Sequence, residues 1–250
     1  MSDSRRPARP PADPALAALE AQSQVSEILS LAAGALFGGA IATALAATFV
    51  FDQPMPDDIT TIVWYGIRSA GVVAYILLWL TVISGLAISG GLFPKWAAVL
   101  LPLHQLADLA LSLAVLHAAL LLGDRYAKFT PETLIIPFRS IYEPLWSGLG
   151  IVALYLGAVV FWSVEFRPKI GYARWRQLHY LSFVVFALAL VHGLFAGTDR
   201  ETAPMRLLYL VTGSAVVLLT VLRTVSIMRK NASAPPERST PTRPRATPGM

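Results

Sequence analysis

The sequence predicts an all-α membrane protein, a bundle of six transmembrane helices. Only 14% of its 250 residues are charged and 55% are apolar, whereas soluble domains carry about 25% charged residues. The chain also contains six apolar runs of about 20 residues, the length that crosses a bilayer as a helix. Finally, its four histidines all fall within two of these runs. The first two observations predict the bundle, and the third indicates where its chemistry lies.

The six expected spans are separated by turn-forming or interfacial segments such as "FDQPMPDD", "SGGLFPKW" and "TDRETAP". They cover roughly 28–50, 69–90, 97–122, 146–164, 178–197 and 205–227. The connection 123–145 is interrupted by proline too often to span, and we expect it to lie along the surface as a short amphipathic segment.

A membrane domain at 28–228 is therefore expected between two flanks. The flank 1–27 is polar and proline-rich, and the tail 229–250 is basic and rich in Pro, Ser and Thr, so both are expected to be disordered. Of the 20 Lys and Arg residues, 14 fall in or beside the two flanks and the second and fourth connections. This excess predicts that both termini are cytoplasmic.

Composition also excludes several classes of site. The chain has no cysteine, which excludes disulfides, iron–sulfur clusters and covalently attached c-type haem. No glycine-rich nucleotide fingerprint follows a strand pattern, so no flavin or nicotinamide site is expected. The net charge of +5 is explained by topology and by contacts with anionic lipid, and no nucleic-acid partner is expected.

The histidines repeat one interval. His104 and His117 in "HQLADLALSLAVLH" are thirteen residues apart, as are His179 and His192 in "RWRQLHYLSFVVFALALVHG". Spans three and five run in the same direction, so the inner pair His104/His179 and the outer pair His117/His192 lie at two matching depths, about 19.5 Å apart. Two imidazoles facing each other across a bundle suit the axial positions of six-coordinate haem iron. The sequence thus predicts that the four histidines are ligands of haem iron at two stacked sites between helices three and five.

The thirteen-residue interval does not place both histidines on the same face of an ideal helix. Thirteen residues leave two side chains roughly 140° apart around an ideal helix, so bending or a change in the hydrogen-bond ladder is required. The alternative is that the histidines are packing residues with interhelical hydrogen bonds, as in a non-redox transporter or assembly subunit. A zinc site is less favoured because each depth supplies only two histidines.

Three further residues are candidates for contacts around the haems. Asp108 lies one turn after His104 on the same helix face and could orient a ligand or take up protons; a protonated, hydrogen-bonded carboxyl is the alternative. Arg174 and Arg176 precede span five and could contact haem propionates, or serve only as positive-inside charges. Arg68, Arg125 and Arg139 are weaker candidates of the same kind on the outer side.

The two histidine segments, with the intervening "IPFRSIYEPLWSGLGIVALYL", resemble the ferric reductase-like transmembrane superfamily. This superfamily includes ferric reductases, NADPH oxidases and the haem-binding membrane subunit of the bacterial methionine sulfoxide reductase system. The resemblance covers about half of the chain. It implies a dihaem cytochrome b with His104, His117, His179 and His192 as iron ligands, in a bacterial inner membrane.

The resemblance implies an oxidoreductase component. The oxidases and eukaryotic ferric reductases carry a C-terminal flavin and NADPH domain, whereas this chain ends in a polar tail. We therefore expect a separate cytoplasmic-side electron donor, a flavoprotein or a quinol. The outer-side acceptor could be ferric iron, oxygen, a quinone or a periplasmic partner reductase. A haem-bearing anchor for a quinone-linked dehydrogenase is a further possibility.

Overall fold

All regular secondary structure in the described part of the chain is helical, as the composition predicts. The computed structural model describes residues 57–232, so the flank 1–27, the expected first span 28–50 and the tail from 233 onward lie outside the described residues. The helices are α2 (Asp57–Gly90), η1 (Pro94–Trp96), α3 (Ala97–His104), α4 (Ala107–Leu120), η2 (Leu121–Gly123), α5 (Pro131–Ile135), α6 (Pro144–Ile170), α7 (Tyr172–His179), α8 (Leu181–Ala196) and α9 (Ala203–Ala232).

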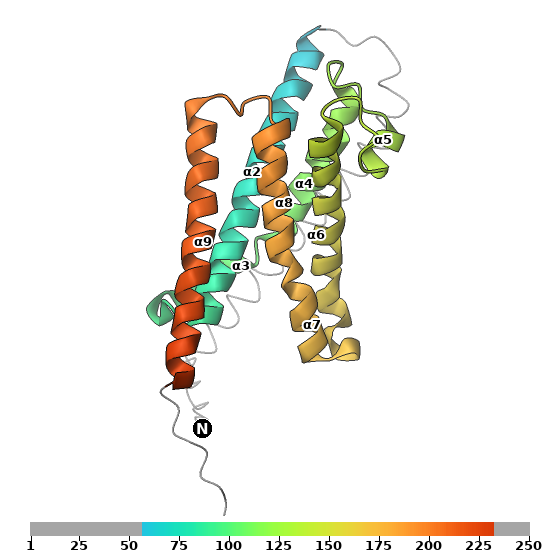
Figure 1. Cartoon of the computed structure of the whole chain (residues 1–250). Coiled ribbons are helices and arrows are strands. Elements are labelled where there is room, and N and C mark those ends of the chain that lie inside the picture. The colour runs from blue at the N-terminus through green and yellow to red at the C-terminus, as the bar shows by residue number, and fades with distance from the viewer. Residues whose placement is uncertain (1–56, 233–250) are drawn as a thin grey trace, which may run out of the picture.

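Four helical stretches among the described residues are long and apolar enough to cross a bilayer. They are α2, α6, α7 together with α8 over Tyr172–Ala196, and α9 over Ala203–Arg229. These helices lie side by side along one axis (Figure 1). Large apolar side chains on their outer faces are exposed, for example Leu210 at 67% and Val217 at 65%. An apolar exterior of this kind suits a lipid environment.

α2 is longer than the span expected at 69–90. It begins at Asp57, with Asp57 and Asp58 in its first turn, where negative charge interacts favourably with the helix dipole. The hydropathy pattern predicted only residues 69–90 of this helix and missed the twelve residues before them. The polar first turns extend it beyond the neighbouring helix ends in Figure 1.

The expected third span, 97–122, is not one continuous helix. It is broken at Gln105 and Leu106, between α3 and α4. The Leu106 amide donates to the Leu103 carbonyl at 3.3 Å, a bond across three residues instead of four. Pro102 has no amide hydrogen to donate, so the ladder also lacks one bond in the turn before the break. The apolar helix that follows, Ala107–Gly123, is shorter than a full span.

The fifth span has a matching irregularity. α7 ends at His179 and α8 begins at Leu181, and the Tyr180 amide donates to the carbonyls of both Arg176 and Gln177, at 3.2 Å each. In both helices the ladder is therefore distorted directly after the first histidine. This is the kind of distortion that a thirteen-residue interval requires if both histidines are to reach the same partner helix.

The connection between η2 and α6 does not span, as expected, and it folds back along α6. The Tyr155 hydroxyl, three turns into α6, donates to the Ile135 carbonyl at 2.5 Å. Ile135 and Ile141 are 63% and 81% exposed, so this segment presents apolar side chains outward. Phe138 has a φ of 66° and packs against Gly148, where no side chain stands in its way.

The core joins α2, α8 and α9. Tyr75 of α2 stacks on Phe186 of α8, with ring centres 5.8 Å apart, and meets Tyr209 of α9 edge-on at 5.4 Å. The Tyr75 hydroxyl also shares a buried hydrogen bond of 2.6 Å with the Thr212 hydroxyl. Leu86, at 1% exposure, belongs to the same cluster. This core fixes α2 and α8 relative to each other, and both helices contribute to the site.

Candidate histidine site

The fold brings the four histidines together in two pairs. The lower pair, toward the α7 end in Figure 1, is His104 and His179, with ring centres 5.9 Å apart and ring planes at 69°. The upper pair is His117 and His192, at 6.4 Å and 75°. The pairing is the one that the sequence predicts. It joins α3 to α7 and α4 to α8.

Three of the histidines are held in the same way by a neighbouring helix. In each case the imidazole Nδ1 lies within hydrogen-bond distance of a backbone carbonyl, and a glycine stands four residues after that carbonyl. The bonds are His104 to Thr81 at 3.0 Å beside Gly85, His117 to Ile67 at 2.8 Å beside Gly71, and His192 to Trp146 at 2.9 Å beside Gly150. We call each carbonyl with its glycine a socket.

The glycine is a steric requirement of the socket. A Cβ at Gly71 would lie 2.8 Å from the Nδ1 of His117, and one at Gly150 would lie 2.7 Å from the Nδ1 of His192. A Cβ at Gly85 would lie 3.0 Å from the Cε1 of His104. Any side chain there would push the imidazole away from its carbonyl. Only glycine leaves the carbonyl of the preceding turn accessible.

The sockets also fix the protonation of the rings. A carbonyl oxygen can only accept, so the proton of each of these neutral imidazoles is on Nδ1, and Nε2 keeps its lone pair. Nε2 is separated from Nδ1 by Cε1 alone, so the bond to the carbonyl leaves it unprotonated on a ring that lines the cavity. In the described residues no hydrogen bond involves the Nε2 of any histidine. The arrangement leaves nitrogen lone pairs available to a bound group.

His179 is the exception. Its Nδ1 is buried and has no hydrogen-bond partner within the described part of the chain. Its ring instead stacks on Trp175, one helical turn earlier in α7, with ring centres 5.1 Å apart and planes at 27°.

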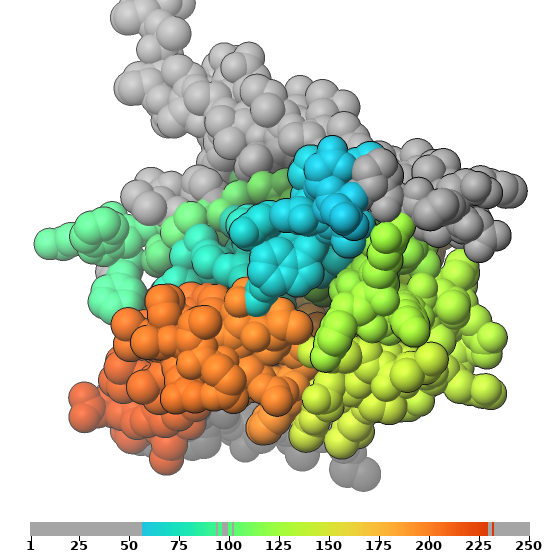
Figure 2. Space-filling view, turned by 90° about the horizontal axis from the view of Figure 1, so that it is seen from above, coloured from blue at the N-terminus to red at the C-terminus, as the bar shows by residue number. Residues whose placement is uncertain are grey.

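Both pairs line one cavity of about 1530 Å³ that extends along the bundle. This volume exceeds the 300–1,000 Å³ of an ordinary small-molecule pocket. Its middle is lined by apolar and small residues of four helices, including Leu111, Leu154, Gly157 and Val185. Figure 2 looks onto the upper end, where α2 (cyan), the α8–α9 connection (orange) and the segment after α4 (green) meet around a narrow recess.

The lower end of the cavity is lined by cations and ring N–H donors. Arg176, a sequence candidate, lines it, whereas Arg174 is exposed and is not among the lining residues. Arg167, Arg223 and Trp175 also line it and were not predicted. The Nε1 of Trp175 and the Nε of Arg223 are buried without a hydrogen-bond partner in the described residues. These donors could bind acidic groups of a ligand.

Asp108 also lines the cavity, in the first turn of α4, directly after the break that follows His104. Its backbone carbonyl accepts a hydrogen bond of 2.8 Å from the Ser112 hydroxyl. No ion pair to its carboxylate is found in the described residues. The structure therefore places this acid in the cavity wall without assigning it a partner.

At the upper end, the α8–α9 connection is bonded both to α2 and to the segment before α6. Asp199 forms a two-pronged ion pair with Arg68 of α2, which also lies over the Trp64 ring at 3.8 Å. Arg68 thus lines the cavity as an already paired cation. Two of the outer-side candidates differ from it: Arg125 and Arg139 are not lining residues, and Arg139 contacts Glu132 at 3.8 Å on the surface.

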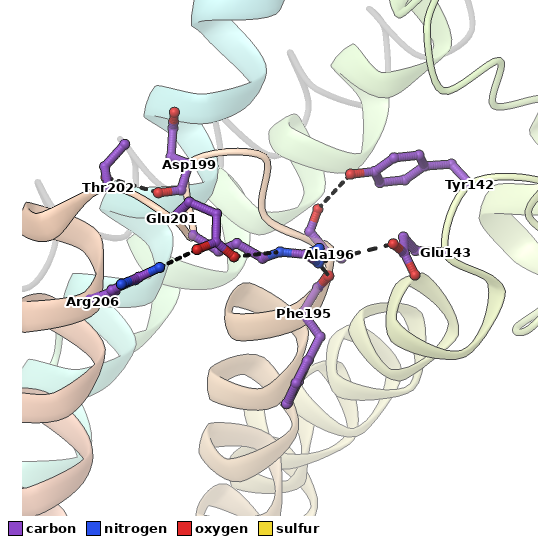
Figure 3. Close-up of polar contacts among 9 residues, drawn as sticks. Tyr142, Glu143, Phe195, Ala196, Asp199, Glu201, Thr202 and Arg206 are labelled. Carbon is purple, nitrogen blue, oxygen red and sulfur yellow. Dashed lines mark hydrogen bonds and ion pairs between the residues drawn. The ribbon is translucent and has the colours of Figure 1, made fainter.

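The second tie comes from the segment before α6 (Figure 3). The Tyr142 hydroxyl donates to the Ala196 carbonyl at 3.0 Å, and Arg200 donates to the Phe195 carbonyl and lies 4.0 Å from Glu143. Burial, and then the Glu143 carboxylate, raises the pKa of the Tyr142 phenol, so the hydroxyl remains a donor. The end of α8, just after His192, is therefore held against α6.

No group of three or more histidine, aspartate or glutamate side chains within residues 57–232 is arranged to bind a metal ion by itself. Each depth offers two imidazoles, which matches a metal whose other ligands come from a cofactor better than a zinc site of four protein ligands. Comparison with protein-family models, with curated proteins and with solved structures gives no match for this chain.

Proposed function

We propose that this protein is a transmembrane electron carrier that holds two b-type haems, one between the histidines of each pair. The observation that carries the proposal is the pair of facing imidazoles at each of two depths in one large cavity. The rings of each pair lie opposite each other, and in three of the four the bond from Nδ1 to a carbonyl leaves Nε2 unprotonated, the tautomer that a metal ligand at Nε2 needs.

The spacing of the rings fits this assignment. A metal–imidazole bond is about 2 Å, and the centre of a five-membered ring lies about 1.1 Å from each ring atom. Two imidazoles on opposite sides of one metal ion therefore have centres about 6.2 Å apart by these lengths. The observed separations are 5.9 and 6.4 Å. Direct interhelical packing would not require both pairs to have this separation.

When bound, each haem would supply a one-electron iron couple. The residues of the chain would determine the orientation of the iron ligands, their basicity and the surroundings of the haem. The sockets orient His104, His117 and His192 and, by accepting a hydrogen bond from Nδ1–H, would make these imidazoles more basic ligands. The middle of the cavity is lined mainly by apolar and small side chains, which would surround a bound group with a medium of low polarity. Arg167, Arg176, Arg223 and the Trp175 N–H lie where propionates of a lower haem would need partners.

The orientation follows from charge. The lower end carries the basic residues of the α6–α7 region and of late α9, and an excess of Lys and Arg marks a cytoplasmic side. We therefore propose a bacterial inner-membrane protein with both termini in the cytoplasm. A separate flavoprotein or quinol would donate electrons at the lower end, and an acceptor outside the cell membrane would receive them at the upper end.

The deciding experiment is a visible spectrum of the protein purified in detergent from haem-replete cells, oxidised and dithionite-reduced, with a pyridine-haemochrome assay. We expect a reduced α band typical of b-type haem and two haems per chain. One haem per chain would restrict the proposal to one pair, and single histidine variants would identify it. A colourless protein would contradict the proposal and favour histidines that serve as interhelical packing residues.

A further inference from the structure

The lower pair contains the one histidine without a socket, and the helix opposite it shows why. On α2 the two socket glycines, Gly71 and Gly85, are fourteen residues apart, an interval that keeps them within about 40° on one helix face. On α6 the upper socket glycine is Gly150, and the residue fourteen positions later is Val164. Val164 lines the cavity. A valine side chain therefore stands at the position of α6 that corresponds to Gly85 of α2.

The corresponding segments of α2 and α6 share the carbonyl and the serine, and they differ in that α6 has Val164 where α2 has Gly85. On α2, the Thr81 carbonyl accepts both from Ser84, at 3.0 Å, and from His104, at 3.0 Å. On α6, the corresponding Val160 carbonyl accepts from Ser163 at 2.6 Å. A carbonyl oxygen has two lone pairs, so the serine does not exclude a second donor. The missing element on α6 is the glycine.

Trp175 lies where it can hold the His179 ring in place of the missing carbonyl socket. It lies four residues before His179 on the same face of α7, and its ring is nearly parallel to the imidazole at 5.1 Å. Its own position is supported from α6, because the Arg167 guanidinium lies 5.4 Å from the Trp175 ring centre. A flat aromatic surface restricts rotation of the imidazole although no carbonyl fixes Nδ1.

We propose that Trp175 is the positioning residue for His179, and that it replaces by stacking the carbonyl socket that holds the other three histidines. This inference rests on the proposed function for its role toward haem. Its consequence is that the lower pair is asymmetric: His104 is a hydrogen-bonded ligand, whereas His179 is a weaker donor because its Nδ1–H has no acceptor among residues 57–232. A new socket should therefore lower the potential of the lower haem.

The test uses four forms of the full chain in detergent: wild type, Trp175→Leu, Trp175→Phe, and Trp175→Leu combined with Val164→Gly. The leucine variant should lose most of its lower haem, from two haems per chain toward one, and keep the upper haem. The phenylalanine variant keeps the flat ring but lacks the N–H, and it should retain more of the lower haem than the leucine variant. The double variant should regain the lower haem, because glycine opens the Val160 carbonyl to His179, and its midpoint potential should lie below that of the wild type.

A leucine variant with the haem content, spectrum and lower-haem potential of the wild type would overturn the inference and leave the proposed function standing. A double variant that is not rescued would also count against it. Haem-free protein provides an independent readout, because the chain has only four histidines to resolve by selective labelling and NMR. Trp175→Leu should shift the ring-proton signals of one histidine, His179, whatever the haem content; unchanged signals would overturn the inference even if the wild type binds no haem.

Discussion

The substitution Gly150→Ala tests the socket of His192 directly. The added methyl group would lie 2.7 Å from Nδ1, 2.8 Å from Cε1 and 3.0 Å from Cγ of His192. The methyl group would therefore contact the rigid imidazole ring and not the end of a flexible side chain. The imidazole must move, and its 2.9 Å hydrogen bond to the Trp146 carbonyl is lost.

The magnitude follows from three contributions. Overpacking costs about 1–3 kcal/mol, loss of a buried hydrogen bond costs about 1–3 kcal/mol, and the higher helix propensity of alanine returns about 1 kcal/mol. The expected net loss in the free energy of unfolding is thus about 1–5 kcal/mol. The upper haem should be lost or weakened in the same variant.

The matched control is Gly157→Ala in the same helix. Its methyl group would meet only Val185 at 3.7 Å and Leu111 at 3.8 Å, which is ordinary contact. Denaturant unfolding in detergent, followed by circular dichroism, should show Gly150→Ala destabilised and Gly157→Ala at or above the wild type. Equal stability of the two variants, with equal haem content, would refute the reasoning about the sockets.

Three other variants test separate parts of the structure. His192→Leu should remove the upper haem and leave the lower haem bound, measured by haem stoichiometry; loss of both with retained helicity would show that the two sites are not independent. Tyr75→Phe should cost about 1 kcal/mol, since it removes one buried hydrogen bond to Thr212, and denaturant unfolding would reveal a negligible effect if the bond is unimportant. Arg68→Leu should free Asp199 and increase hydrogen exchange in the α8–α9 connection; unchanged exchange would mean that the ion pair does not hold this connection.

The sequence predicted the helical class and the pairing of the histidines because both depend on patterns within single helices. The low charge and the apolar runs locate α2, α6 and α9, and the repeated thirteen-residue interval places His104 opposite His179 and His117 opposite His192. The same interval predicted a distortion of the helix between its two histidines, but not its position directly after His104. At that position the histidine is bonded to a carbonyl of α2, a contact between separate segments that the local pattern does not encode.

The sockets could have been predicted from the spacing of glycines, which a hydropathy pattern does not consider. Gly71 and Gly85 are fourteen residues apart in an apolar helix, an interval close to the thirteen residues between histidines. By contrast, the cations Arg167 and Arg223 could not be predicted as cavity residues. They lie 56 residues apart in the chain, on different helices, and only the folded bundle brings both to the lower end.

The sockets also determine the order in which this protein can be assembled. His104 and His117 take their carbonyls from α2, and His192 takes its carbonyl from α6, the helices that come just before them in the chain. The α2–α4 hairpin therefore contains the carbonyls that orient His104 and His117 before α6 and α8 are synthesised. The α6–α8 hairpin in turn contains the carbonyl that orients His192. Three of the four imidazoles thus take their orientation from within their own half of the bundle, and the union of the two halves is needed only to bring the rings opposite one another.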